Sequence, residues 1–399
     1  MYSPKTFFKG TFTGISNTLL QHFSNEVNPI EIQKALVVSK LSRYEYERNK
    51  HKNLTDKELQ IHLRKRGTDV EKLIHFYDLQ KKFEDNVANT LRDMGIDVEV
   101  VNRLNCNEDM VKEADVVLPT GGDGTFLLAA SRVLDNKKPV VGFNSDPTRS
   151  EGYLCLPKRY SSDIRGAIER LQKGCFEWLM RSRIRTTLVV SEEENLVPKY
   201  LHDTEGDCDA LFKVKTRSNG DGGKVLPVLA LNEVFVGESL SARVSHLQMR
   251  LNGSTENTNL KCSGVCVSTG TGSTSWHLSM NRLPIQSVAE LLKLLDIEAT
   301  EDKNSLAAVL SDIYNKNLIF APDDINMGYT IRDLISAGVW PQPKGIKSRG
   351  FAKKIEIKSN CFDACLVVDG GVSFCFNDGT IALLEVLPED ALRTVVFKD

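Results

Sequence analysis

The chain has 399 residues, of which 41% are hydrophobic and 26% are charged, and its formal net charge is -2. This composition is typical of a globular protein long enough for two domains, and the near-neutral charge argues against a nucleic-acid binder. No apolar run reaches the length of a membrane span, so we expect a soluble protein without a membrane partner.

Residues 1–28 are predicted to be a mitochondrial transit peptide. They contain Lys5, Lys9 and many hydroxyl side chains, and no acidic residue precedes Glu26. Such a basic, hydroxyl-rich and acid-poor segment is typical of organelle presequences, although it contains no arginine and an unstructured N-terminus has a similar composition. The localisation that we expect is the mitochondrial matrix.

Residues 29–182 are predicted to form a Rossmann-like parallel α/β domain. Ala35–Ser39 is an apolar first strand, and strand-like segments at 97–101, 116–118 and 140–143 alternate with helical ones. This alternation favours a doubly wound parallel sheet. Ligands of such sheets bind at the carboxyl ends of the strands, where Gly121–Thr125 and Asn144–Pro147 fall.

Residues 183–376 are predicted to form a C-terminal β-rich, β-sandwich-like domain. It contains an acidic, glycine-dotted segment at 191–224, predicted to be a flexible insertion, and a segment at 285–316 with apolar residues at helical spacing. The apolar stripe of this helical insertion suits either a core or a subunit interface. The final residues, 377–399, form a strand segment that can return to the α/β domain.

The nine cysteines lie at irregular spacings, which favours a reducing compartment over a disulfide scaffold. Two C-x3-C pairs, Cys262 with Cys266 and Cys361 with Cys365, have a spacing compatible with zinc. Both pairs adjoin strand-like runs, however, in which cysteine behaves as a small buried hydrophobic residue. We therefore expect no metal ligated by a dedicated cluster of protein side chains.

The most informative motif is Gly121-Gly122-Asp123-Gly124-Thr125, between an apolar strand and a helix. Glycines let a ligand approach the backbone, and the helix offers unpaired N–H groups to an anion. Asp123 would repel phosphate unless it holds a cation or takes a proton from an attacking hydroxyl. The competing interpretation is an ordinary turn with Asp123 as the helix N-cap.

A second D-G-T triplet, Asp378-Gly379-Thr380, lies between two strand-like segments and has no helix after it. We interpret it as a hairpin turn between antiparallel strands.

Two further polar segments interrupt apolar strands. Asn232 and Glu233 lie inside one such strand, so they either close a turn or form hydrogen bonds with a ligand. Thr269–Trp276 is rich in hydroxyls and glycine and carries no charge. It suits a ribose or diphosphate, and equally a plain polar turn.

Together the three segments resemble the NAD kinase family, which carries G-G-D-G-T, an apolar-N-E-apolar strand and T-P-T-G-S-T-A-Y in this order. Asn144–Gly152 and Val367–Gly371 are similar to the mitochondrial branch of that family. The resemblance implies transfer of the γ-phosphoryl group of ATP, with Mg2+, to the 2′-hydroxyl of the adenosine ribose of NAD, giving NADP. It also implies self-association, and we expect a homodimer.

The resemblance implies roles for individual residues. Asp123 is the catalytic residue, which accepts the proton of the 2′-hydroxyl or orients that hydroxyl. The residues expected to bind NAD and ATP are Gly121, Gly122, Gly124, Thr125, Asn144, Tyr153, Asn232, Glu233, Thr269, Thr271, Gly272, Ser273, Thr274, Ser275 and Trp276.

This chain departs from the common family pattern at several positions. Gly270 replaces a proline and Trp276 replaces a tyrosine, although tryptophan still offers a ring to stack on adenine. Ser263 replaces an acidic contact to the nicotinamide side, so the choice between NAD and NADH is not implied. Tyr153 is either a wall of the adenosine pocket or a packed aromatic residue.

Two other functions compete with this one. Diacylglycerol and sphingosine kinases also carry G-G-D-G-T, but the N-E strand and the Thr269–Trp276 loop argue against a lipid kinase. A non-catalytic NAD(P) sensor is disfavoured because Asp123 and the Asn232-Glu233 pair are intact.

Overall fold

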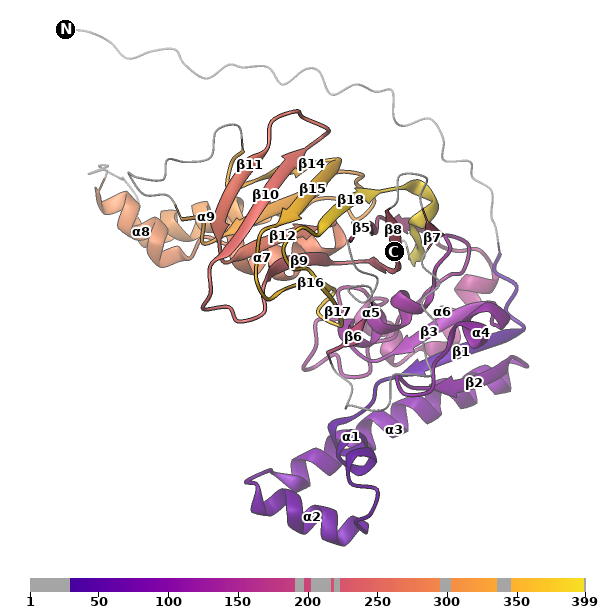
Figure 1. The fold of residues 1–399 in the computed structure, drawn as a ribbon. Helices are drawn as coiled ribbons and strands as arrows, with labels where there is room; N and C mark the ends of the chain where they lie inside the picture. The colour runs from indigo at the N-terminus through magenta and orange to yellow at the C-terminus, as the bar shows by residue number, and fades with distance from the viewer. Residues whose placement is uncertain are drawn as a thin grey trace, which may run out of the picture.

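The computed structural model describes residues 29–190, 197–201, 217–218, 223–294, 303–335 and 346–397. The predicted transit peptide and most of the predicted insertion at 191–224 lie outside the described residues, so both stay predictions. The described chain combines a parallel sheet flanked by helices with two larger antiparallel sheets (Figure 1). The predicted mixed α/β fold with a parallel sheet is therefore confirmed.

The parallel sheet has the strand order β2-β1-β3. Alternate residues of its central strand enter two different cores, because side chains of a strand point to opposite faces. Ala35 and Val37 pack with side chains of α3 and α6, whereas Leu36 and Val38 pack with side chains of α4 and α5. The elements are β1 (Lys34–Ser39), β2 (Asp97–Val101), β3 (Val116–Thr120), α3 (Val70–Asp93), α4 (Glu108–Glu113), α5 (Asp123–Arg132) and α6 (Ile164–Gln172).

The segment at 140–143, which we expected to be a strand, forms isolated parallel bridges with β3. Val140 pairs with Val117 and Phe143 pairs with Thr120. The segment thus lies beside β3 at the edge of the sheet, and its carboxyl end leads into Asn144 next to the glycine turn.

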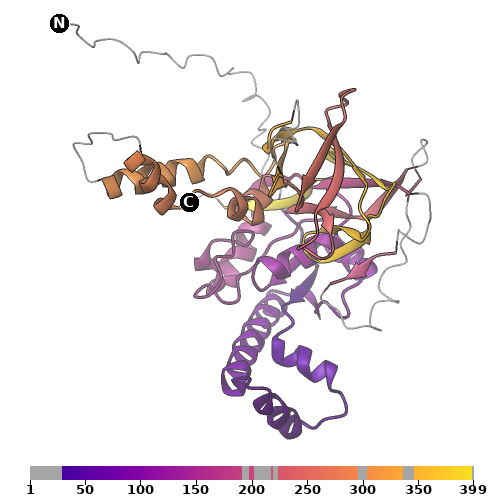
Figure 2. The same cartoon turned by 60° about the vertical axis from the view of Figure 1, so that its left-hand side comes forward.

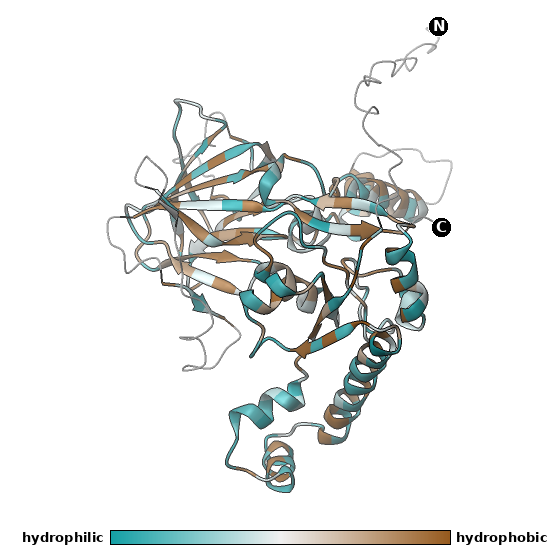
Figure 3. Cartoon of the chain, turned by 90° about the vertical axis from the view of Figure 1, so that its right-hand side faces the viewer, coloured by the Kyte–Doolittle hydropathy of each residue, from teal (hydrophilic) through white to brown (hydrophobic). Residues whose placement is uncertain are grey.

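An arm of three helices projects from the parallel sheet (Figures 1 and 2). It consists of α1 (Arg43–Lys50), α2 (Asp56–Lys65) and the start of α3. Capping boxes at Ser42 and Thr55 begin the two short helices. A small cluster that includes Leu59 and Leu63 holds the arm together. Of its helices, α1 is made of hydrophilic residues (Figure 3).

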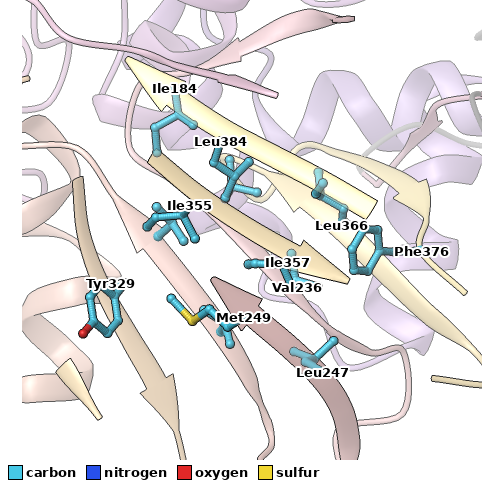
Figure 4. Close-up of a cluster of buried hydrophobic side chains, with 14 of the residues drawn as sticks. Ile184, Val236, Leu247, Met249, Tyr329, Ile355, Ile357, Leu366, Phe376 and Leu384 are labelled. Carbon is cyan, nitrogen blue, oxygen red and sulfur yellow. The ribbon is translucent and has the colours of Figure 1, made fainter. Parts of the chain in front are cut away.

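The two antiparallel sheets contain seven strands each and share one hydrophobic core. Val236 and Leu366 enter it from one sheet, and Ile355 and Leu384 enter it from the other (Figure 4). The first sheet comprises β5 (Ile184–Val189), β7 (Arg217–Ser218), β8 (Lys224–Ala230), β10 (Ser245–Leu251), β11 (Thr258–Cys262), β15 (Lys354–Ser359) and β18 (Ile381–Val386). The second comprises β6 (Lys199–Tyr200), β9 (Glu233–Glu238), β12 (Gly264–Ser268), β13 (Met327–Arg332), β14 (Arg349–Ala352), β16 (Ala364–Val368) and β17 (Val372–Cys375).

The segment predicted to be a helical insertion contains α8 (Ile285–Leu294) and α9 (Lys303–Lys316). These helices pack against each other through Val288, Leu292 and Ala307, and they project away from the sheets (Figure 2). Other apolar side chains of the same helices, including Leu291 and Val309, are exposed. The apolar stripe is therefore only partly used within the chain.

The structure divides the predicted C-terminal segment 377–399 between two sheets. β18 lies between β15 and β5 in the first antiparallel sheet. Only β19 (Leu392–Val396) leaves that sheet, because it pairs with β4 (Glu177–Arg181), and Arg393 forms a parallel bridge with Pro139.

The buried Arg183, just before β5, forms hydrogen bonds with both the end of α5 and the segment before β19. Its guanidinium donates hydrogen bonds to the carbonyl groups of Ala130 and Val133 at the end of α5, and to that of Asp390 before β19. A helix leaves its last carbonyl groups unsatisfied, so this arginine serves as a C-terminal cap supplied by a distant segment.

The predicted hairpin at Asp378-Gly379-Thr380 is wrong. β17 pairs with β16 in one sheet, whereas β18 pairs with β15 and β5 in the other. The turn therefore carries the chain from sheet to sheet. Two consecutive strands with a D-G turn between them look like a hairpin in sequence, but pairing depends on which distant strands complete each sheet.

Within the described segments, no helix is both long and apolar enough to cross a bilayer.

Candidate nucleotide-binding site

The glycine turn joins β3 to α5. Gly122 is the N-cap and Asp123 is the first helical residue, so the N-cap interpretation of Asp123 is wrong. Its carboxylate instead accepts hydrogen bonds from the backbone N–H groups of Tyr153 (3.2 Å) and Leu154 (2.9 Å). The carboxylate thus fixes the 150–154 segment against the beginning of α5.

The glycines of this turn have different packing requirements. A Cβ on Gly121 would lie 2.3 Å from Oγ1 of the buried Thr125, and one on Gly122 would lie 2.9 Å from Oγ of Ser150. A Cβ on Gly124 would meet no atom within 4 Å. Gly121 is therefore required by packing, whereas the space at Gly124 is open to a ligand.

A cavity of about 610 Å³ lies beside the turn. Five predicted nucleotide-site residues line it: Gly122, Asp123, Gly124, Thr125 and Asn144. Three basic residues that the motifs did not indicate also line it: Lys40, Arg103 and Arg132. Their sequence signal is weak, because only their positions at the ends of two strands and of α5 distinguish them from surface cations.

The buried Asn144 organises the loop that follows residues 140–143. Its Nδ2 donates to the carbonyl oxygen of Ser150 (2.9 Å), and its Oδ1 accepts from the N–H of Asp146 (3.1 Å). Tyr153 at the end of this loop has a side chain that is 64% exposed. The alternative of a packed aromatic residue at this position is therefore excluded.

The expected apolar strand around Asn232 is broken into β8 and β9 at Leu231-Asn232. The carboxylate of Asp369, which follows β16, holds the backbone in place at this break. It accepts the N–H groups of Leu231 (2.8 Å), Asn232 (2.8 Å) and Glu233 (3.0 Å). Sequence reasoning missed this role of Asp369 in shaping the site. Its only sequence signal is an acidic residue directly after a buried strand.

Asn232 and Glu233 present buried polar atoms that lack a partner within the described structure. Asn232 donates from Nδ2 to Oγ of Ser275 (3.3 Å), but its Oδ1 and Oε2 of Glu233 form no hydrogen bond. Buried polar atoms are normally satisfied, so these two oxygens are available for hydrogen bonds with a ligand.

The surroundings of Glu233 favour its protonated form. Burial and, to a smaller extent, the charge of Asp369 raise the pKa of Glu233 to about 8. Burial also raises the pKa of Asp369 to about 6, against the opposing effect of the three N–H groups. The Glu233 carboxyl group can therefore donate a hydrogen bond, while Oδ1 of Asn232 can accept one.

The Thr269–Trp276 loop uses several hydroxyl groups internally. Thr269 donates to the carbonyl oxygen of Leu231 (2.5 Å), Ser273 to that of Gly270 (2.6 Å) and Thr274 to that of Thr271 (3.2 Å). These donors hold the short helix η3 (Thr271–Thr274), which is followed by α7 (Trp276–Asn281).

Close backbone contacts explain the glycines of this loop. A Cβ on Gly272 would lie 2.1 Å from the carbonyl oxygen of Asn232, and one on Gly270 would lie 1.7 Å from that of Ala321. The second contact leaves no room here for the proline of the common family pattern.

Arg181, at the end of β4, connects two of the motifs. Its Nη1 donates to Oγ1 of Thr271 (3.3 Å). Burial lowers the pKa of Arg181 to about 10, and the nearby charges of Asp123 and Cys155 act in the opposite direction. Sequence reasoning missed this arginine, since nothing local distinguishes it from other strand residues.

Trp276 packs beside an aromatic neighbour and lines a second cavity. Its ring lies 4.9 Å from that of Phe235, at an interplanar angle of 38°. The second cavity, of about 430 Å³, also contains Arg332 and Arg349. Arg332 pairs with Asp333 of the same cavity (3.3 Å), so the Trp276 ring and Arg349 are the groups that could receive an aromatic or anionic ligand group.

The described residues contain no group of three His, Cys, Asp or Glu side chains that could hold a metal ion. Cys262 and Cys266 are free and buried in β11 and β12.

Known proteins resemble the chain over most of its length. No protein-family model matches it. It is 38% identical over 378 residues to NAD kinase 2, mitochondrial, from Rattus norvegicus, which covers 92% of this chain and 88% of the relative. The human protein of the same name is 37% identical, with coverages of 92% and 84%.

A solved structure of yeast NADH kinase complexed with NADH covers 92% of this chain and 84% of its own, with 14% identity and a TM-score of 0.50. This likeness concerns the fold. The sequence identity with the rat and human relatives confirms the resemblance that the three motifs indicated, and the chain belongs to the NAD kinase family.

Proposed function

We propose that the chain transfers the γ-phosphoryl group of ATP to the 2′-hydroxyl of the adenosine ribose of NAD where the glycine turn, the Asn232-Glu233 turn and the Thr269–Trp276 loop meet. Family membership supplies the overall reaction, phosphorylation of NAD to NADP, and the mitochondrial location. The observation that carries the residue assignment is the pair of unpartnered buried oxygens on Asn232 and Glu233. Thr271 accepts a hydrogen bond from Arg181, whose guanidinium lies near the charge of Asp123.

Asp123 is the catalytic residue in this proposal. It accepts the proton of the 2′-hydroxyl or orients that hydroxyl for attack, a contribution of roughly 10²- to 10⁴-fold in such reactions. The N–H groups of Gly121 and Thr125 donate to the carbonyl oxygens of Phe143 and Gly122. Those of Gly122, Asp123 and Gly124 have no acceptor among the described residues, so they can receive phosphate oxygens. Arg181 places positive charge beside Asp123 and Thr271, where it stabilises the negative charge of the transferred group.

The adenosine of NAD is bound by a complementary pair of polar groups. The protonated Glu233 donates a hydrogen bond and Oδ1 of Asn232 accepts one, which suits ribose hydroxyls or ring nitrogens. Thr271, Ser275 and the Trp276 ring complete this side. The remaining loop residues maintain the conformation of the loop. The hydroxyls of Thr269, Ser273 and Thr274 donate hydrogen bonds within the protein, and Gly272 lies against the backbone of Asn232.

Mg2+ enters as part of the MgATP substrate. Magnesium in such sites is usually held by one or two carboxylates together with the phosphates, and it neutralises phosphate charge when bound. Asp123, which lines the larger cavity, supplies one such carboxylate.

We further propose two domains, 29–182 and a β-rich part from 183, that work as one enzyme in a homodimer. The separate cores of the parallel sheet and of the antiparallel sheets support the division. The exposed apolar side chains of α8 and α9 support self-association.

The direct test is product formation by the purified chain with MgATP and NAD, followed with a dehydrogenase that accepts only NADP. NADH is offered as a rival acceptor, and radiolabelled ATP with diacylglycerol or sphingosine tests the lipid kinase alternative. NADP formation that depends on Asp123 supports the proposal. Labelled lipid without NADP, or NAD binding without turnover, would contradict it.

A further inference from the structure

We propose that Lys40, Arg103 and Arg132 form a cationic seat for the triphosphate of the phosphoryl donor. This inference rests on the proposed function, because it names the donor side of the same site. None of the three belongs to the motifs from which the chain's function was inferred.

The topology places two of these cations beside the glycine turn. The strands β2, β1 and β3 are parallel and adjacent in this order, so their carboxyl ends share one edge. Arg103 follows the end of β2, Lys40 directly follows β1, and Gly121 directly follows β3. Ligands of open parallel sheets bind at this edge, and here it carries two positive charges next to a helix N-terminus.

Backbone contacts fix the spacing between Lys40 and the turn. The N–H of Lys40 donates to the carbonyl oxygen of Thr120 (3.1 Å). A Cβ on Gly121 would lie only 3.1 Å from Cβ of Lys40. The Lys40 side chain therefore begins next to the backbone of the glycine turn. Lys40 is exposed, so its ammonium group can reach a ligand there.

One cavity joins the three cations to the catalytic residue. The cavity of about 610 Å³ is lined by Lys40, Arg103 and Arg132 together with Asp123 and Gly124. Its volume lies within the usual range of about 300–1,000 Å³ for small-molecule sites. Its apolar lining, from Leu127, Leu128, Val228 and Leu229, suits a nucleoside attached to the phosphates.

The groups that we propose to bind the acceptor lie outside this cavity. Asn232, Glu233 and Trp276 do not line this cavity. Phosphoryl transfer requires the leaving and attacking oxygens on opposite sides of the transferred group. Asp123, which borders the cavity, stands at the position where the two substrates meet.

The other carboxylates of the cavity are engaged with groups of the protein. Asp369 accepts three backbone N–H groups. Asp146 accepts the hydroxyl of Thr148 (2.7 Å) and pairs with Arg149 (3.6 Å). Arg103 rests over the ring of Tyr46, 5.3 Å from its centroid, which orients the guanidinium. The cavity thus presents oriented positive charge suited to a polyanion.

Steady-state kinetics of Lys40→Met and Arg103→Met test the seat. Charge-assisted hydrogen bonds to phosphate justify an increase in KM for ATP of roughly 10-fold or more for each variant. We expect KM for NAD to stay within about twofold. Lys57→Met in α2 and Arg165→Met in α6 are matched controls, because both side chains are exposed and neither lines the cavity. An increase in KM for NAD alone would place these cations on the acceptor side and overturn the inference.

Binding of inorganic tripolyphosphate, measured by calorimetry without NAD, separates the seat from catalysis. Wild type and both controls should bind it, and Lys40→Met and Arg103→Met should bind it at least about fivefold more weakly. Far-UV circular dichroism confirms that each variant is folded, and Arg103→Lys should retain part of the affinity. Equal binding by all variants would overturn the seat even if wild type makes NADP. A wild type that binds tripolyphosphate but makes no NADP would instead refute the proposed function.

Discussion

The tripeptide D-G-T occurs twice in this chain, and the two copies differ in what surrounds them. Asp123-Gly124-Thr125 begins α5 beside a cavity. Among the described residues the N–H groups of Asp123 and Gly124 have no acceptor, whereas that of Thr125 donates to the carbonyl oxygen of Gly122. In Asp378-Gly379-Thr380 all three N–H groups donate hydrogen bonds within the protein. Their acceptors are the carbonyl oxygens of Cys361, Ser359 and Asn377, respectively. The same residues therefore leave two N–H groups available to a ligand in one place and form a connection with no available N–H group in the other.

The sharpest way to break this comparison is to make the same substitution in both copies. Asp123→Asn should lower kcat by roughly 10²- to 10⁴-fold with little change in NAD affinity, because it removes a proton acceptor while one oxygen remains to accept an N–H group of Tyr153 or Leu154. Asp378→Asn should leave kcat within about twofold. Initial rates give kcat for each variant, and titrations with NAD give its affinity. Similar rates for the two variants would refute the catalytic role of Asp123.

A third aspartate, Asp369, extends the contrast because its carboxylate serves the fold. Asp369→Asn should lower the free energy of unfolding by about 1.5–3 kcal/mol, since a charge-assisted acceptor of three N–H groups is lost. We also expect KM for NAD to rise as the Asn232-Glu233 turn loosens. Urea unfolding and kinetics measure both effects. Asp363→Asn, an exposed position before β16, is the control, and an equal loss of stability there would contradict the assignment.

The glycines of the turn sharpen the comparison at the level of packing. Gly121→Ala should destabilise the protein by about 1–3 kcal/mol, because its Cβ would overlap Oγ1 of Thr125. Gly124→Ala has open space and a helical position, so its unfolding free energy should be equal or slightly higher. Thermal and urea unfolding without nucleotide test the pair. Equal destabilisation of both would show that packing does not distinguish the two glycines.

The smallest expected effect is a pH dependence of NAD binding. The folded pKa of Glu233 is raised from 4.5 to about 8, so its contribution to stability is present below pH 4.5 and is lost as pH rises through 8. Affinity for NAD should likewise fall above pH 8, when the carboxyl group no longer donates. Glu233→Gln keeps a donor at every pH, and calorimetry between pH 6.5 and 9 should give a nearly flat profile. A Gln variant with the wild-type pH profile would exclude Glu233 as its source.

Features with a local cause could be predicted from the sequence. The order strand, glycine turn and helix around Asp123 follows from apolar spacing and from glycine, and the structure has β3 and α5 there. The helical insertion follows equally from the spacing of apolar residues that now pair across α8 and α9. The resemblance of the three motifs indicated the family, which the curated relatives show.

Features that depend on distant partners could not be predicted. The break between β8 and β9 requires Asp369, which lies 138 positions after Leu231. The hydroxyl groups of Thr269 and Ser273 donate hydrogen bonds within the protein. Whether a loop hydroxyl does so depends on where neighbouring carbonyl groups lie, which the local sequence does not show.

By itself the sequence therefore determined the elements beside the site and the chemistry that the motifs carry, because backbone propensity and side-chain periodicity act over a few residues. Only the tertiary structure decided which groups remain available to a ligand. It brought Arg181 to Thr271 and aligned Arg103 and Lys40 with the glycine turn. It also sealed the second D-G-T triplet between two sheets. The physical reason is that every buried polar group must find a partner, and that partner is set by the packing of segments far apart in the chain.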